Sequence, residues 1–155
     1  MSRVDDATRL LARLLLAACL IPSAISKAGN ISGFALSIAA TGLPYPNALA
    51  AGAVIISLFG PVALAIGSLP RVTGVTLALY TAVTTLLLHP FWNFPGATRH
   101  IEQALFVANV GVVAGLLLYA LTGPGEWSWQ AWWRSSSEPE VEPVRQRSPR
   151  VTRVA

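Results

Sequence analysis

Three long stretches without a charged residue constrain the fold more than any other feature of this sequence. No Asp, Glu, Lys or Arg occurs in residues 28–70, 72–98 or 103–125. Helices built from such stretches are apolar on every side, so they cannot wrap a water-soluble core. A helix needs about 20 apolar residues to cross a bilayer. The sequence therefore predicts an all-α membrane protein, and a soluble all-α protein with buried helices is the disfavoured alternative.

Prolines, glycines and isolated cations divide these stretches into four predicted transmembrane helices, packed as a bundle. Between the first two spans, the apolar segment 34–40 is too short to cross a membrane. We expect it to form a short helix at the interface, capped by Asn30 or Ser32. Pro70 is expected to close the second span. The four spans are expected over residues 8–28, 48–69, 72–88 and 101–122.

The sequence divides into a membrane domain over residues 1–134 and a polar tail over 135–155. The tail is rich in Ser, Pro, Glu and Arg, so we expect it to be disordered. The exit from the fourth span is rich in tryptophan, which prefers the membrane–water boundary. We interpret this segment as a membrane anchor, with a docking surface for a partner as the alternative. Its tryptophans are Trp127, Trp129, Trp132 and Trp133.

The distribution of cations predicts the topology. Nine Lys or Arg residues lie on the side of the two termini and two, Lys27 and Arg99, on the other side. The positive-inside rule then places both termini in the cytoplasm. Residues 16–19, Leu-Ala-Ala-Cys, match a lipoprotein cleavage box, but the apolar stretch before them is short for a signal peptide. We expect an uncleaved span.

Small and polar residues inside the spans predict how the helices pack. Gly74 and Ala78 in the third span, and Gly111 and Gly115 in the fourth, have the spacing that lets helices approach closely. In the second span a proline frees the carbonyl of the residue four positions earlier, so this region is expected to face protein. The cations near the ends of the first span are expected to reach the interface. These residues are Pro61, Ser57, Arg13 and Lys27.

The segment 89–96, between the third and fourth spans, has the most distinctive composition in the chain. His89 could transfer protons, and an aromatic ring such as that of Trp92 could flank a quinone head group. Asn93 and Arg99 complete this candidate quinone-proximal set. The alternative is a rigid turn in which His89 caps a helix. Haem ligation by His89 and His100 is disfavoured, because both lie near one surface.

Other site chemistries are weakly represented. Cys19 is the only cysteine, which excludes a CxxC pair or a Cys-based zinc site within the chain, and we expect no metal site. There is no nucleophile–base arrangement, phosphate loop or paired carboxylate, so a self-contained hydrolase is disfavoured. The net charge of +4 is read as topology and lipid attraction, not nucleic-acid binding.

Four sequence elements give the chain a family resemblance. They are the first-span end closing on Lys27, the Gly-Leu-Pro of residues 42–44, the His-Pro-Phe-Trp of 89–92, and residues 106–115 with Asn109. In this order and spacing they resemble the DoxX family of small four-span bacterial membrane proteins. Many members carry a glutamate where this chain has Ser57 and a lysine where it has Ala108. Those two charges would be expected to pair in hydrocarbon.

The resemblance implies a redox-linked role in the bacterial cytoplasmic (inner) membrane. Because both intramembrane charges are missing, we expect an accessory subunit of a membrane redox complex, bordering a noncovalently bound quinone. A quinone-linked oxidoreductase subunit acting through His89 is the first alternative, so enzyme status stays open. A small-solute transporter or channel is the second, although its candidate polar residues form a thin set. They are Ser57, Thr81, Thr84, Thr85 and Asn109.

Overall fold

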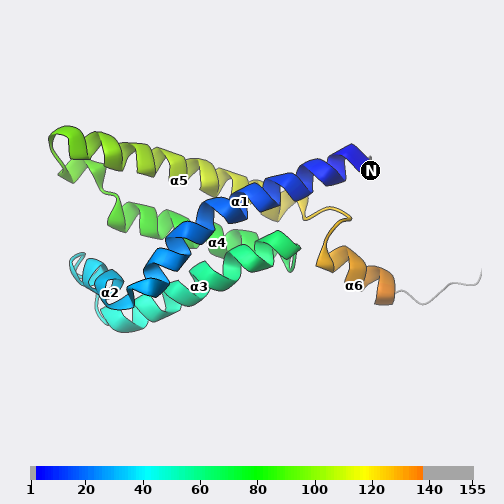
Figure 1. The fold of residues 1–155 in the computed structure, drawn as a ribbon, viewed down its shortest axis with the longest axis horizontal. Coiled ribbons are helices and arrows are strands. Elements are labelled where there is room, and N and C mark those ends of the chain that lie inside the picture. Colours follow the sequence, from blue (N-terminus) through cyan, green and yellow to red (C-terminus); the bar gives the residue numbers. More distant parts are fainter. Residues whose placement is uncertain (1–2, 138–155) are drawn as a thin grey trace, which may run out of the picture.

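The computed structural model describes residues 3–137, which contain helices and no strand (Figure 1). Four of the helices are long and apolar enough to cross a membrane, which confirms the expected all-α, four-span architecture. The long helices are α1 (Arg3–Gly29), α3 (Pro46–Ile66), α4 (Pro70–Leu88) and α5 (Gly96–Thr122). The short ones are α2 (Ile31–Ala39), the 3-10 turn η1 (Phe91–Asn93) and α6 (Trp129–Ser137).

The helix boundaries differ from the expected spans where a local backbone feature decides them. α3 ends at Ile66 because Gly67 adopts a left-handed conformation, with φ of 73°. Pro70 does not close the second span as expected. It opens α4, since the first helical position needs no N–H and suits the fixed φ of proline. Asn30 is the cap of α2, accepting a 2.9 Å hydrogen bond from the Gly33 N–H, whereas Ser32 lies inside that helix.

The four long helices pack as two pairs. α1 packs mainly on α3, and α4 packs mainly on α5, with α3 and α4 joining the pairs. Their shared core is centred on Ala17, Leu64, Leu77 and Leu116, all buried. We call the end of the bundle with α2 and η1 the α2 end, and the opposite end, with the start of α1 and α6, the α6 end (Figure 1).

Small residues bring α4 and α5 together, but only in part as expected. A Cβ added to Gly74 would lie 2.8 Å from the Ala120 Cβ and 2.9 Å from the Leu116 carbonyl oxygen, so this contact requires glycine. The expectation for Gly111 is wrong, because a Cβ there would meet nothing within 4 Å. Gly115 faces the Leu16 side chain of α1.

The middle of α3 faces protein, as the proline in it predicts. Ser57 and Pro61 are both buried. The Ser57 hydroxyl donates a 3.0 Å hydrogen bond to the Val54 carbonyl within the same helix. This arrangement turns the interrupted part of the hydrogen-bond ladder towards protein, while other residues of α3 stay exposed.

Arg13 holds the α6 end together, which corrects the expectation that its charge reaches the interface. It is 2% exposed, and its Nη2 donates a 2.7 Å hydrogen bond to the Trp127 carbonyl. One face of α1 also brings Asp6 to the Glu126 N–H, at 3.0 Å, and Arg9 to the Thr122 carbonyl, at 3.4 Å. Three side chains at helical spacing therefore fix the connector between α5 and α6.

Exposed tryptophans lie in this connector and in α6. Trp127, Trp129, Trp132 and Trp133 are each about half exposed. Their role as a membrane anchor stays a prediction, to which this exposure is suited. α6 continues to Ser137, three residues beyond the expected domain boundary at 134, and most of the expected tail lies outside the described residues.

Candidate functional site

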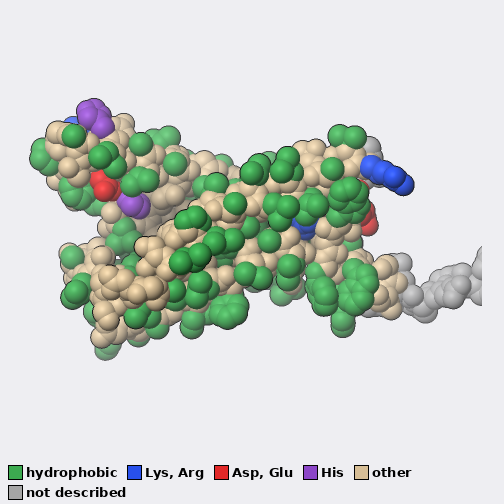
Figure 2. Space-filling view, in the orientation of Figure 1, with side chains coloured by type: hydrophobic (Ala, Val, Ile, Leu, Met, Phe, Trp, Pro, Cys, Tyr) green, Lys and Arg blue, Asp and Glu red, His purple; other side chains and the backbone are tan. Residues whose placement is uncertain are grey.

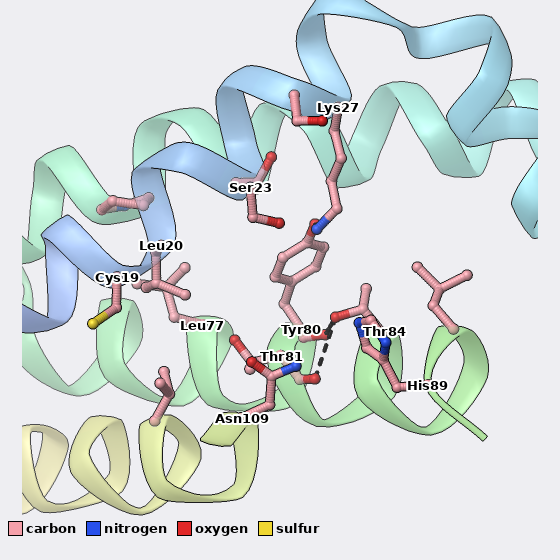
Figure 3. Close-up of a pocket in the computed structure, with 15 residues that line it drawn as sticks. Cys19, Leu20, Ser23, Lys27, Leu77, Tyr80, Thr81, Thr84, His89 and Asn109 are labelled. Atoms are coloured by element: carbon pink, nitrogen blue, oxygen red, sulfur yellow. Dashed lines mark hydrogen bonds between the residues drawn. The ribbon is translucent and has the colours of Figure 1, made fainter. Parts of the chain in front are cut away.

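A polar cavity of about 320 Å³ lies between the two helix pairs. α1, α3, α4 and α5 all contribute to its wall, and Figure 3 shows side chains from different helices pointing into it. Leu20, Leu77 and Val112 supply its apolar lining. The polar lining consists of Ser23, Ser26, Lys27, Ser57, Tyr80, Thr81, Thr84, His89 and Asn109.

Lys27 and Tyr80 meet across the cavity from opposite helix pairs. The Lys27 Nζ donates a 3.2 Å hydrogen bond to the Tyr80 hydroxyl oxygen (Figure 3). The ammonium lies 5.4 Å from the centroid of the Tyr80 ring and 5.5 Å from that of Phe34, so two aromatic faces stabilise its charge. Lys27 lines the cavity near the α2 end of the bundle, and the expectation that its charge reaches the interface stays a prediction.

His89 and Glu102 form an ion-pair contact at the α2 end. The His89 Nδ1 lies 2.7 Å from the Glu102 Oε2, and both side chains are partly buried. His89 caps α4 through its backbone N–H, which bonds to the Thr85 carbonyl, so the helix end fixes the position of the imidazole. Glu102 lies in the first turns of α5. The position of this helix start therefore determines that Nδ1 is the ring nitrogen of His89 that bonds to Glu102.

The hydroxyl groups of the wall differ in how they are satisfied. Thr84 donates to the carbonyls of Tyr80, at 2.8 Å, and Thr81, at 3.2 Å, within its own helix. The Thr81 hydroxyl is buried and has no hydrogen-bond partner in the described part of the chain. A buried polar group in this state calls for a ligand or a water molecule as partner. The Thr81 hydroxyl, which lines the cavity, is therefore available to hydrogen-bond to a molecule in it.

The charged lining of the cavity is positive and not balanced by a carboxylate. Lys27 brings a positive charge to it, and no carboxylate belongs to the lining. Such a wall favours a neutral or anionic molecule that accepts hydrogen bonds. Among the described residues, no three His, Cys, Asp or Glu side chains are grouped to hold a metal ion.

The structure brings only part of the candidate quinone-proximal set to this cavity. His89 lines it, whereas Trp92, Asn93 and Arg99 do not. The Trp92 ring packs edge-on against Phe91, at 5.1 Å between centroids, as expected of a rigid aromatic turn. His100 is exposed and lies outside the cavity.

Lys27 and Thr84 were named from the sequence, but not as members of one site. Lys27 is ionisable and closes a membrane span, and such residues mark functional sites by default. Tyr80 was not predicted, although it lies four residues before Thr84 and shares one face of the helix with it. Glu102 had no such signal, because its distance from His89 depends on how the turn between α4 and α5 folds.

The two positions at which the family resemblance fails do not face each other. Ser57 lines the cavity, whereas Ala108 is exposed on the outer side of α5. The two positions therefore give no sign of the pairing expected of a glutamate and a lysine there.

Four apolar helices, arranged in two pairs, define a multi-pass membrane protein with an internal polar cavity. Figure 2 shows this protein parted into two lobes at its α2 end, with hydrophobic side chains along the length of the visible face. The chain belongs to the DoxX family, whose sequence signature matches residues 8–90, more than half of the 155 residues. The match includes Lys27 and ends just after His89; the fourth-span element of the resemblance lies beyond it.

Individual relatives extend the similarity into α5. Inner membrane protein YqjF of Escherichia coli K12 is 28% identical over 128 residues, covering 83% of this chain and 93% of the relative. Inner membrane protein YphA of the same organism is 28% identical over 116 residues, covering 75% and 83%. The ER-derived vesicles protein ERV29 of Saccharomyces cerevisiae is 28% identical over 75 residues, covering 48% and 24%. No solved structure matches the chain.

Proposed function

We propose that this protein binds the head group of a quinone in the cavity between its helix pairs, as an accessory subunit of a bacterial membrane redox complex. The observation that carries the proposal is the donor pair Lys27–Tyr80, held at 3.2 Å in the polar cavity between the helix pairs. An intramembrane cation is costly, and a ligand that accepts its hydrogen bonds offsets that cost.

The wall suits the chemistry of a quinone ring. An ammonium has three N–H donors, so Lys27 can hold the Tyr80 oxygen and a quinone carbonyl together. The Tyr80 O–H, and the unpartnered Thr81 hydroxyl, are two further donors. Leu77 and Leu20 provide the apolar surface against which a flat ring packs.

His89 and Glu102 supply a proton route in this proposal. Reducing a quinone to a quinol takes two electrons and two protons. His89 uses Nδ1 towards Glu102, so its other ring nitrogen is the one that exchanges a proton with the ligand. The electrons come from a redox partner, which is why we propose an accessory subunit in preference to an enzyme acting alone.

Quinone binding is tested directly with the full-length protein in nanodiscs. A short-chain quinone analogue is titrated and its binding measured by microscale thermophoresis. Lys27→Met and Tyr80→Phe are expected to weaken binding about tenfold each, the effect of losing one charge-assisted hydrogen bond. Arg99→Gln, which removes a cation outside the cavity, is the matched control and is expected to bind as the wild type does. Undiminished binding by Lys27→Met would refute the site.

The accessory role has a separate test. The native membrane is extracted in a mild detergent, the tagged chain is pulled down, and an absorbance spectrum is taken of the same sample. Co-purifying haem or flavin proteins in fixed ratio support the proposal. A single colourless species would remove the redox-complex assignment while leaving quinone binding to be judged by the titration.

A transporter is the second candidate, favoured by one observation. Four of the five polar residues expected to be too few for transport line the same cavity as Lys27, and only Thr85 does not. The four are Ser57, Thr81, Thr84 and Asn109. Transport proteins place polar groups of this kind near the membrane midplane. Flux of small anions into proteoliposomes, abolished by Lys27→Met, would favour this candidate over quinone binding.

We also propose that the protein lies in the bacterial inner membrane with the α6 end in the cytoplasm. The names of YqjF and YphA describe inner membrane proteins. The described cations are concentrated at the α6 end, as the positive-inside rule requires of a cytoplasmic face. C-terminal fusions are expected to be fluorescent with green fluorescent protein and inactive with alkaline phosphatase. The described cations at the α6 end are Arg3, Arg9, Arg13, Arg71 and Arg134, whereas those at the α2 end are Lys27 and Arg99.

A further inference from the structure

An apolar groove on the outside of the bundle differs from the proposed quinone cavity in all of its lining residues except Cys19, which lines both. It has a volume of about 510 Å³ and lies between α1 and α5, two helices that make few contacts with each other. Leu15, Leu16 and Leu118 line it. Lipid-facing grooves of this kind are ordinary unless something polar marks one end.

The α6 end of this groove is marked by positive charge. Arg9 lines the groove there and donates to the Thr122 carbonyl at 3.4 Å. A guanidinium has five N–H donors, so Arg9 can hold this carbonyl and a phosphate at once. Arg13 lies one turn deeper on the same face, is buried, and adds a second positive charge. The nearby carboxylate of Asp6 is turned towards the Glu126 N–H and is not part of the groove.

The length of the groove matches one leaflet of a bilayer. From Thr8 to Cys19 it follows α1 for twelve residues, a rise of about 16 Å along an α-helix. The hydrocarbon core of a bilayer is about 30 Å thick, so one leaflet is about half of that. The floor is set by Gly115, where an added Cβ would lie 3.1 Å from the Leu16 side chain.

We infer that this groove binds one anionic phospholipid of the leaflet at the α6 end, with an acyl chain along Leu15, Leu16 and Leu118 and its phosphate on Arg9. Charge complementarity selects this occupant over a second copy of the chain, since a copy would have to bring an acidic group to the same place. The inference does not depend on what occupies the polar cavity.

The test uses the full-length protein in bilayers with a phosphatidylglycerol that carries a diazirine near the end of one acyl chain. We expect saturable photolabelling of α1 near Cys19 and of α5 near Gly115, competed by unlabelled phosphatidylglycerol more strongly than by phosphatidylcholine. Arg9→Gln is expected to lower labelling about fivefold at limiting lipid, the contribution of one interfacial cation. Arg3→Gln removes an exposed cation from the same helix end, outside the groove, and is expected to change nothing.

A steric variant separates the groove from the head-group contact. Ala12 is exposed and lines the groove, so Ala12→Trp fills it without disturbing the core and is expected to abolish the labelling. Labelling spread evenly over the four long helices, equal competition by phosphatidylcholine, or labelling unchanged in both Arg9→Gln and Ala12→Trp would each overturn the inference.

Discussion

Replacing Gly74 by alanine tests the closest helix contact in the bundle. The added methyl group would lie 2.8 Å from the Ala120 Cβ and 2.9 Å from the Leu116 carbonyl oxygen, and the latter atom belongs to a rigid helix backbone. Overpacking of this kind costs about 1–3 kcal/mol. Alanine recovers about 0.5–1 kcal/mol of helix propensity, which leaves a net loss of about 0.5–2 kcal/mol.

The matched control is the same substitution at Gly111. Nothing lies within 4 Å of a Cβ at that position, so only the helix propensity changes, with a gain of about 0.5–1 kcal/mol. For a chain of this size, 1 kcal/mol corresponds to about 2–4 °C in the melting temperature. Gly74→Ala is therefore expected to melt about 1–8 °C below the wild type and Gly111→Ala about 1–4 °C above it.

The assay is fluorescence-detected size-exclusion chromatography of the full chain, heated in detergent at a series of temperatures. The opposite signs make the result specific, since a general effect of detergent or of added apolar surface would move both variants in one direction. A melting temperature for Gly74→Ala at or above that of the wild type would refute the argument that this glycine sets the distance between α4 and α5.

Three further substitutions are expected to have local effects. His89→Ala removes the 2.7 Å contact with Glu102 and is expected to cost about 1 kcal/mol, while His100→Ala, on an exposed residue, leaves the melting temperature unchanged. Asn30→Ala removes the cap of α2, at about 0.5–2 kcal/mol, and should speed amide exchange over residues 31–39. Exchange no faster than in the wild type would contradict the capping role. Arg13→Met frees the connector after α5, so exchange over residues 123–134 is expected to rise about tenfold or more, and unchanged protection there would mean that Arg13 does not hold it.

The four spans were predictable because hydropathy depends on local sequence alone. Their ends were less so, since they depend on backbone conformations. Gly67 in a left-handed conformation stops α3 before the apolar run is over, and Pro70 starts the next helix. A prediction based on the length of the apolar run extends the second span to Pro70, because it considers side-chain hydropathy and not the backbone turn at Gly67.

The site was harder to predict than the spans. Residues that share a helix face can be identified from their spacing. A polar face of α4 with Tyr80, Thr81 and Thr84 could therefore be predicted from the sequence. Which helices face each other cannot be read in this way. The meeting of Lys27 with Tyr80 depends on the pairing of α1 with α3 and of α4 with α5.

The charge of a side chain was also a poor predictor of its burial. Arg13 was expected to extend to the interface, as long cationic side chains do near the ends of spans. Instead a backbone carbonyl of the connector after α5 lies close enough to accept its hydrogen bond, and the side chain is buried. Such a partner, 114 residues away in sequence, leaves no local signal.

That distance in sequence has a consequence for how the protein is made. The carbonyl to which Arg13 bonds is synthesised 114 residues after Arg13 itself. At 5–20 residues per second, this delay is about 6–23 s. During that time the arginine is in an unfinished protein without its acceptor. A chain released before Trp127 therefore lacks the carbonyl that accepts the Arg13 hydrogen bond, and its first helix keeps a cation without this acceptor.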